Sequence, residues 1–265
     1  MDPLIVHIDG IGFWAPGIPD WAALIRVLEG GESAPSDANA RPSPSALPPT
    51  ERRRAPEPVL IACEAAGQAC AMAGRDPSTL ACVFTSTHGD LAITDAMCAT
   101  LAADPRELSP TRFHNSVHNA PAGYWTVAAH CHATATAISA SQGSFAAGLL
   151  EAAIQAHADE ETVLLSAYDI AARGPLAEVA PSALPFAVAF VLSPTRSPHS
   201  LARLSLQTTK PSSASNDAPT SLASLIGNPM AAQSLPLLVA LGRRETTHVT
   251  IASGADTALR IEVTP

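Results

Sequence analysis

The sequence predicts an α/β layered domain. Continuous apolar runs at residues 80–86, 163–167 and 186–192 are typical of strands that are covered on both faces. Longer alanine-rich segments with helical spacing lie between these runs. Strands that alternate with helices along a chain indicate a sheet with helices packed against it.

The composition indicates a globular protein with an acidic surface. Of the 265 residues, 47% are hydrophobic and 15% are charged, so the chain can bury a sizeable core. Aromatic residues make up only 4%, so small side chains must fill that core. The formal net charge is −9 and Lys210 is the only lysine, which argues against nucleic acid as a partner.

Neither a membrane span nor a secretory signal is expected. The best apolar run, residues 186–192, is far shorter than the roughly 20 residues that cross a bilayer. The N-terminus is acidic and lacks the basic stretch of a signal peptide. The five cysteines are odd in number and lie in apolar segments, which is typical of buried free thiols in a reducing compartment. We therefore expect a cytoplasmic protein.

The N-terminal part begins with a predicted strand at residues 3–8. A helix follows from about Asp20, because the apolar residues at positions 21, 24, 25 and 28 share one helical face. Residues 32–58 are rich in Ser and Pro, which predicts an irregular segment. A helix at 59–74 then leads to the buried strand at 80–86.

The middle of the chain continues the alternation. Its predicted elements are, in order, a helix at 91–103 capped by Asp90, a loop at 104–118, a helix that begins at Asn119, a buried strand at 133–139 and a helix at 143–157. The buried strands at 163–167 and 186–192 complete this part.

The C-terminal part is expected to differ. Its predicted elements are a strand at 202–207, a polar linker at 208–220, a helix at 230–241 kinked at Pro236, and a hairpin of strands at 248–252 and 259–263. We therefore divide the chain into a domain at 1–195 and a short extension at 196–265 that packs on the same domain.

Histidines cluster in the middle of the chain, where five of the nine lie between His88 and His132. No spacing typical of zinc ligands occurs among them, and consecutive residues on a helix point in different directions. We expect structural histidines here, with no metal and no other cofactor.

The segment SASQGS at 139–144 lies between a predicted strand and a predicted helix, where a nucleophile gains exposure and the positive end of a helix dipole. Ser141 or Ser144 is the candidate nucleophile of an independent acyltransferase or thioesterase. The GxSxG elbow is not matched, because position 139 is Ser. No general base is recognisable, and capping a helix is the commoner role of such a serine.

Asp90 and Asp169 each follow a predicted strand. Carboxylates at strand ends occur in active sites, but they cap turns more often. We expect the structural role for both.

Several segments, taken in order, resemble the N-terminal half of a β-ketoacyl synthase of the thiolase fold. They are GIGFWAPG, FTSTHGD, FHNSVHNAPAGYW, ATAISASQGSFAAGLLEAA, VLLSAYD and PFAVAFVLSP. The resemblance covers residues 1–195. It implies a layered α/β/α fold with a mixed central sheet and an abbreviated C-terminal part.

More narrowly, FHNSVHNAPAGYW followed by SFAAGLLEAA is similar to the chain length factors of aryl polyene and xanthomonadin pigment clusters. Those proteins are described as catalytically silent partners of a true ketosynthase in a type II polyketide system. The resemblance implies a heterodimer with an active β-ketoacyl synthase. It also implies that an acyl chain bound to an acyl carrier protein reaches this subunit through that partner.

Departures from a working synthase predict that the chain is silent. The resemblance places the family's nucleophilic cysteine at Ala140, between Ser139 and Ser141. Cys131 lies upstream of the strand and cannot replace it. The family's two catalytic histidines belong to a C-terminal half, and beyond residue 200 this chain offers only His248.

The same resemblance implies a partner interface, because the family segment equivalent to residues 110–127 lies at the dimer contact and reaches the partner's acyl tunnel. The implied interface and tunnel residues are Arg112, Phe113, His114, Asn115, His118, Asn119, Tyr124 and Trp125. A bulky Phe113 or Arg112 would sterically exclude further two-carbon units. Tyr124 and Trp125 are expected to be exposed aromatics of the kind enriched at interfaces. The alternatives are that the segment is a packed edge of the core, or that the protein is a self-associated scaffold.

Overall fold

The protein was analysed as a computed structural model that describes residues 3–31, 41–180, 182–211, 222, 225 and 227–265. The strands are β1 (Leu4–Trp14), β2 (Ala81–Thr85), β3 (Ala135–Ile138), β4 (Val163–Asp169), β5 (Phe186–Ser193), β6 (Ala202–Thr209), β7 (Thr247–Ala252) and β8 (Ala258–Thr264). The α-helices are α1 (Trp21–Leu28), α2 (Pro49–Arg54), α3 (Glu57–Ala73), α4 (Leu91–Ala103), α5 (Pro110–Asn115), α6 (Ala120–Ala128), α7 (Ser144–Ala158), α8 (Leu176–Val179) and α9 (Pro229–Arg243). Two 3₁₀ turns, η1 (Pro77–Thr79) and η2 (Pro105–Glu107), are also described.

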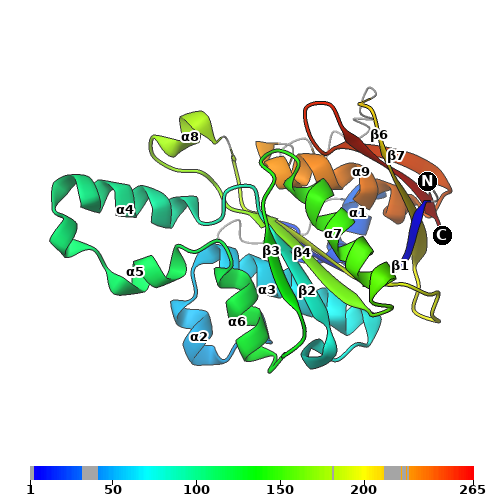
Figure 1. The fold of residues 1–265 in the computed structure, drawn as a ribbon, viewed down its shortest axis with the longest axis horizontal. Coiled ribbons are helices and arrows are strands. Elements are labelled where there is room, and N and C mark those ends of the chain that lie inside the picture. Colours follow the sequence, from blue (N-terminus) through cyan, green and yellow to red (C-terminus); the bar gives the residue numbers. More distant parts are fainter. Residues whose placement is uncertain (1–2, 32–40, 181, 212–221, 223–224, 226) are drawn as a thin grey trace.

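The described strands form one mixed sheet in the order β3-β2-β4-β5-β1-β6-β8-β7 (Figure 1). β2 pairs in parallel with both β3 and β4, and the remaining neighbours are antiparallel. The predicted mixed sheet is thus confirmed. The three strands of the C-terminal part extend the same sheet, and β7 and β8 pair as the predicted hairpin.

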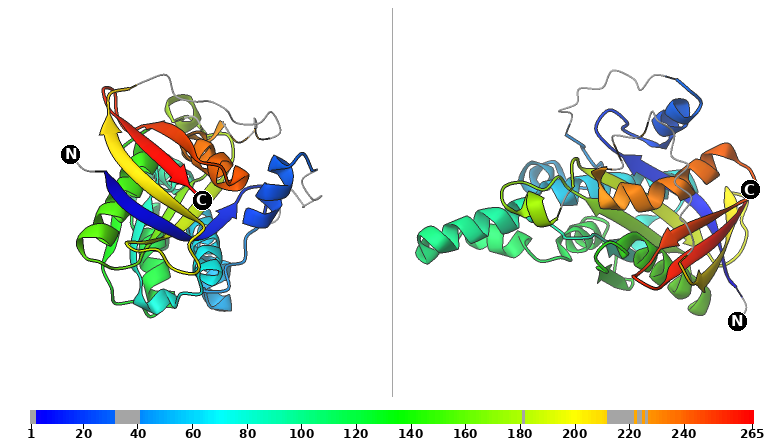
Figure 2. Two further views of the ribbon diagram at one scale, coloured as in Figure 1. Left: turned by 90° about the vertical axis from the view of Figure 1, so that its right-hand side faces the viewer. Right: turned by 90° about the horizontal axis from the view of Figure 1, so that it is seen from above.

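Helices cover both faces of the sheet, as the expected α/β/α layering requires (Figures 1 and 2). One core lies under α3 and α6 and contains the side chains of Phe84, Trp125 and Tyr168. The other core lies under α1, α7 and α9 and contains Phe145 and Phe190. Alanines fill the space between these larger groups, so the backbones approach closely.

The closest approach is between β1 and α3. A Cβ atom on Gly12 would lie 1.8 Å from the carbonyl oxygen of Ala65, and one on Gly10 would lie 2.2 Å from that of Ala69. Two glycines on one strand therefore let a helix rest directly on the sheet.

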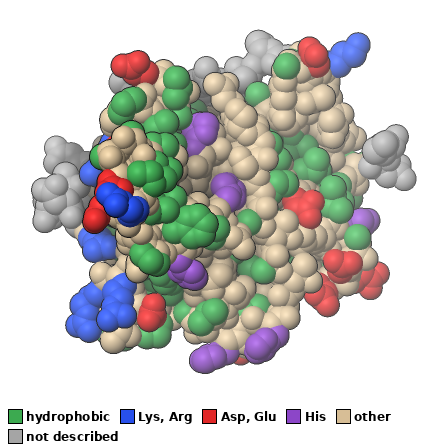
Figure 3. Space-filling view, turned by 60° about the vertical axis from the view of Figure 1, so that its left-hand side comes forward, with side chains coloured by type: hydrophobic (Ala, Val, Ile, Leu, Met, Phe, Trp, Pro, Cys, Tyr) green, Lys and Arg blue, Asp and Glu red, His purple; other side chains and the backbone are tan. Residues whose placement is uncertain are grey.

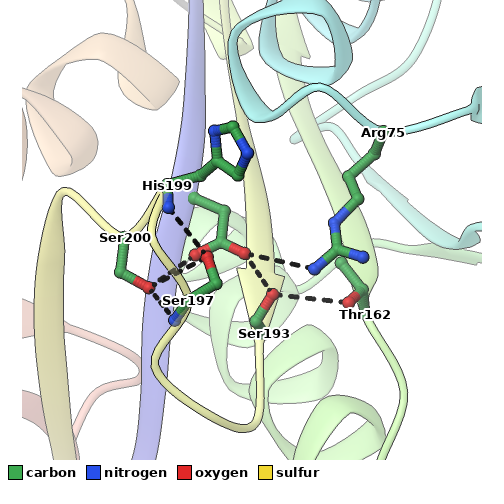
Figure 4. A network of polar contacts seen from close by, with 7 residues as sticks. Arg75, Thr162, Ser193, Ser197, His199 and Ser200 are labelled. Carbon is green, nitrogen blue, oxygen red and sulfur yellow. Dashed lines mark hydrogen bonds and ion pairs between the residues drawn. The ribbon is translucent and has the colours of Figure 1, made fainter.

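Asp9 lies next to Gly10 in the middle of the same strand, at a β-bulge where the register of β1 against β5 shifts. Its buried carboxylate accepts hydrogen bonds from the hydroxyls of Ser193 (2.6 Å) and Ser200 (2.7 Å). The guanidinium of Arg75 lies 3.6 Å away, at the end of α3 (Figure 4). A bulge re-aims a side chain, and here it turns a carboxylate toward partners from three separate segments of the chain, namely β5, the loop before β6 and the loop after α3.

Several expected elements differ from those in the structure. β1 is longer than predicted, and the short helices α2, α5 and α8 occupy segments predicted to be irregular or left unassigned. Pro236 lies inside α9, which continues past it. Residues 32–40 of the predicted irregular segment and 212–220 of the predicted linker lie outside the described residues.

The prediction that the strand at 133–139 is buried is wrong. β3 is shorter, its side chains alternate between exposed and half-buried, and it forms one edge of the sheet. An alanine-rich strand can be covered by its own chain or left uncovered by it, and the sequence of this segment does not distinguish the two.

Among the helices that the structure describes, none is long and apolar enough to cross a membrane. Four of the five cysteines are buried free thiols, as expected. Cys98 is exposed on α4, so the expectation of burial is wrong for that residue.

Candidate functional site

The carboxyl ends of the parallel strands β2, β3 and β4 lie together at one end of the strands, which is where open α/β sheets generally place their sites. The turn from β3 into α7 lies there. Ser141 in this turn is exposed and has a φ of 51°, a left-handed conformation that is uncommon for a residue with a side chain. The chain thus builds the sharp strand–turn–helix unit that presents a nucleophile in other proteins.

The central position of this turn carries no nucleophile. Ala140 is exposed, and its N–H donates to the hydroxyl of Ser144 at 3.0 Å. The Ser144 hydroxyl donates in turn to the carbonyl of Ser141 at 2.6 Å, and Ser144 is fully buried. Both hydrogen-bonding roles of Ser144 are therefore used to close the turn, which counts against it as a nucleophile.

Among the described residues, His248 of the C-terminal part is not brought to this turn. His248 lies on β7, at the opposite edge of the sheet from β3. Cys131 is buried, and its thiol donates to the carbonyl of Leu80. Within the described part of the chain, neither Cys131 nor His248 therefore lies at this turn.

Both strand-end aspartates have structural roles. Asp90 accepts a hydrogen bond from the N–H of Ile93 at 2.9 Å and caps α4, as predicted. Asp169 accepts from the hydroxyl of Ser86 (2.8 Å) and from the N–H (2.8 Å) and hydroxyl (2.6 Å) of Thr87. Burial raises the pKa of Asp169, and these hydrogen bonds lower it, so the burial dominates.

His118 adds a further contact at the carboxyl ends of these strands. One ring nitrogen of His118 lies 3.1 Å from the carbonyl of Ser86, and the hydroxyl of Tyr168 donates to the His118 carbonyl at 3.3 Å. Ser139 donates its hydroxyl to the carbonyl of Thr87. The loops after β2 and β3 are thereby tied together behind the Ala140 turn.

An arm of helices projects from the body at the carboxyl ends of these strands (Figures 1 and 2). It consists of α4, η2 and α5, residues 91–115. The sequence of α4, LAITDAMCATLAA, is largely apolar, yet Leu91 is its one buried residue. Leu101 on the arm is 47% exposed and Phe113 is 59% exposed. Apolar surface of this extent is typical of a site that another molecule covers.

The predicted interface residues differ in their exposure. Arg112, Phe113, His114 and Asn119 are exposed, and His118 and Tyr124 are half-buried. Asn115 is buried, and its side-chain oxygen accepts a hydrogen bond from the hydroxyl of Tyr124 at 3.3 Å.

The expectation that Trp125 is exposed is wrong. Its side chain is fully buried, and its ring centroid lies 6.5 Å from that of Phe84 on β2. The helical spacing of α6 turns position 125 toward the sheet and position 127 outward, so that Val127 is 77% exposed.

A groove of about 560 Å³, here called the α2–α6 groove, runs beside the arm. Its lining residues are Leu47, Pro48, Glu51, His114, Val117, Asn119, Ala120, Gly123, Tyr124, Val127, Ala128 and His130. The space-filling view shows hydrophobic and histidine side chains spread over this side of the molecule (Figure 3). Sequence reasoning missed the α2 wall, because a six-residue helix that begins with proline has too few turns to show a period.

The histidines do not form a metal centre. Within the part of the chain that the structure describes, no three His, Cys, Asp or Glu side chains converge to hold a metal ion.

A mixed sheet between two helical layers, with a sharp strand–turn–helix unit at the carboxyl ends of its parallel strands, is the architecture of thiolase-like proteins. The chain belongs to the family described as β-ketoacyl synthase, N-terminal domain, whose model matches residues 29–251.

Solved structures of ketosynthase systems are similar to the chain. A ketosynthase in complex with its chain length factor from Xenorhabdus doucetiae is 25% identical, with 98% of this chain and 99% of that chain covered and a TM-score of 0.71. The ishigamide ketosynthase/chain length factor is 13% identical, with 98% and 99% covered and a TM-score of 0.70. A type II polyketide synthase acyl-carrier protein in complex with its ketosynthase bound to the hexaketide is 12% identical, with 100% and 99% covered and a TM-score of 0.74. The last two show the fold alone. Among curated proteins, no sequence matches the chain.

Proposed function

We propose that the chain is a catalytically silent, chain-length-factor-type subunit that pairs with an active β-ketoacyl synthase in type II polyketide biosynthesis, of the aryl polyene kind. The observation that carries the proposal is the turn at Ala140. A strand, a sharp turn and a helix follow one another there, and the position where the resemblance places the nucleophile holds a methyl group. A scaffold that keeps the geometry of a site without its chemistry is suited to act through a partner.

The surface around this turn supports pairing with another chain. β3 is an edge strand with outward-facing backbone groups, and it lacks the lysine or proline that commonly protects an edge. The arm adds exposed Leu101 and Phe113 beside it. Burial of this apolar surface and pairing of this edge would together drive association.

The similar structures support the same partner. The Xenorhabdus doucetiae relative is a ketosynthase in complex with its chain length factor, and this chain spans nearly all of the matched chain. A subunit of that length is suited to complete a heterodimer, and the acyl carrier protein would deliver its acyl chain through the active partner.

The arm is the proposed contribution to the acyl tunnel. Phe113 lies in the second half of α5, next to Arg112 and His114, and its side chain is 59% exposed. In a heterodimer such a side chain would close the partner's tunnel and set the length of the product.

The test is co-expression with the ketosynthase encoded nearest to the gene, followed by affinity purification on a tag carried by this chain. We expect a stable one-to-one complex on size-exclusion chromatography. A chain that elutes alone after co-expression with each ketosynthase of its gene neighbourhood would overturn the proposal.

A second candidate, an independent acyltransferase or thioesterase, is favoured by one observation, the exposure of Ser141 at a strained turn. Its test is acylation of the isolated chain by an activated acyl thioester. Labelling that disappears in Ser141→Ala would support this candidate, and labelling that survives both Ser141→Ala and Ser144→Ala would exclude it.

A further inference from the structure

β1 loses one of its two neighbouring strands halfway along its length. β6 pairs with Leu4–Ile8 only, while β5 also pairs with β1 beyond the bulge, on the other side. Side chains of α3 supply acceptors where β6 is absent. The backbone N–H of Phe13 donates to Oε1 of Gln68 at 3.0 Å, and that of Ile11 donates to the thioether sulfur of Met72 at 3.3 Å. Two side chains of a helix thus take the place of a strand beside the second half of β1.

The sulfur of Met72 is the weaker and more reactive of these two acceptors. A thioether accepts hydrogen bonds weakly, and it is the group that two-electron oxidants convert to a sulfoxide. The side chain of Met72 is 40% exposed, whereas Met97 is half-buried and Met230 is buried. Among the methionines that the structure describes, Met72 is therefore the first that an oxidant in solution reaches.

The contact between α3 and β1 leaves the helix no room to follow a larger side chain. A Cβ atom on Gly10 would lie 2.2 Å from the carbonyl oxygen of Ala69 and 2.9 Å from the nitrogen of Ala73, and both alanines lie within one turn of Met72. A sulfoxide is more polar than a thioether, so it gains hydration when it turns toward solvent. The oxidised side chain therefore rotates outward and leaves the N–H of the buried Ile11 without its acceptor, which destabilises the contact.

We propose that Met72 is a peroxide-sensitive site whose oxidation loosens α3 from β1. The sulfur lone pair attacks one oxygen of hydrogen peroxide, an S–O bond forms and the O–O bond breaks. The departing hydroxide takes the proton from the transferred oxygen and leaves as water, so the sulfur loses two electrons and the peroxide gains them. This inference goes beyond the proposed pairing with a ketosynthase and does not rest on it, because β2, β4 and β5 separate β1 from the β3 edge.

The test treats the purified chain with hydrogen peroxide, stops the reaction with catalase and measures thermal unfolding by circular dichroism. Cys98→Ser is the background for every sample, because Cys98 is the exposed thiol among the described residues and would also react. Peptide mass spectrometry should find an added oxygen on Met72 before Met97 or Met230 reacts. The oxidised chain should melt about 2–4 °C below the untreated chain, and methionine sulfoxide reductase should restore the melting temperature.

Two substitutions separate the loss of the acceptor from its oxidation. Met72→Gln keeps an acceptor of the kind that Gln68 offers to Phe13, so it should melt like the untreated chain and not respond to peroxide. Met72→Leu removes the acceptor, so it should melt like the oxidised chain and show no further loss. Met97→Leu is the matched control, and it should lose stability on oxidation as the parent chain does. A loss that persists in Met72→Gln, or a Met72 sulfoxide with an unchanged melting temperature, would overturn the inference.

Discussion

At the scale of the residue, small side chains decide where backbones meet. Gly10 and Gly12 let β1 lie against α3, and Gly148 on α7 lies where a Cβ would be 2.6 Å from Thr85. The alanine-rich composition predicted close packing in general. It could not identify these contacts, since they join residues far apart in the sequence.

Gly12→Ala is expected to destabilise the fold. The new methyl group would overlap the carbonyl of Ala65, so β1 and α3 must separate, at a cost of about 1–3 kcal/mol or more. Thermal unfolding followed by circular dichroism measures the loss. Gly67→Ala on α3 is the control, and it should be neutral or stabilising by up to about 1 kcal/mol. Equal melting temperatures for the wild type and Gly12→Ala would contradict this account.

Asp169 is expected to make stability depend on pH. Burial raises its pKa in the folded state above the unfolded value, so the folded state takes up the proton more readily. This group therefore stabilises the protein increasingly as pH falls from 7 toward the unfolded pKa of about 4.

Asp169→Asn removes that contribution. The free energy of unfolding of the wild type, minus that of Asp169→Asn, should rise as pH falls, as measured by urea titrations between pH 7 and pH 4. A difference that stays constant or shrinks toward acidic pH would show that the carboxyl does not titrate as its burial requires.

At the scale of the element, the arm and the β3 edge are the parts that the body of the protein does not cover. The apolar sequence of β3 predicted a strand, and the sequence of α4 predicted a helix, but neither pattern indicates what an element packs against. The predictions that β3 is a strand and that α4 is a helix are confirmed, whereas the prediction that β3 is buried is wrong.

Ala137→Pro is expected to abolish pairing with the ketosynthase. The carbonyls of Thr134 and Ile138 accept hydrogen bonds from β2, so the N–H of the alternate residue Ala137 points away from the sheet. Proline there removes an outward donor and leaves the pairing with β2 in place. Size-exclusion chromatography of the co-expressed pair measures the complex, and Ala137→Val is the control that should retain it. An intact complex with Ala137→Pro would remove β3 from the interface.

Phe113→Ala is expected to lengthen the product without loss of the complex. The large exposed ring at the end of α5 would no longer close the partner's tunnel. Mass spectrometry of the products released by the purified pair measures the change, and Leu101→Ala on the same arm is the control that should leave the length unchanged. Products of unchanged length would leave Phe113 without a role in the tunnel.

At the scale of the whole molecule, the order of strands and helices was predictable, because long periodic segments alternate along the chain. The mixed sheet was implied by the family resemblance. The short helices α2, α5 and α8 were not predictable, since four to six residues show no period. Consequently the α2–α6 groove could not be foreseen, although seven of its twelve lining residues, from His114 to Val127, lie in the segment 110–127 that the resemblance singled out.

The central claim is that this chain keeps the site architecture of a ketosynthase while another chain does the chemistry. Intact mass spectrometry of the purified pair, after incubation with an acyl thioester of the acyl carrier protein, tests it most directly. The account predicts acyl mass on the partner ketosynthase and none on this chain, which has Ala140 where the resemblance places the family's nucleophile. Acyl mass on this chain would contradict the account and identify it as an enzyme.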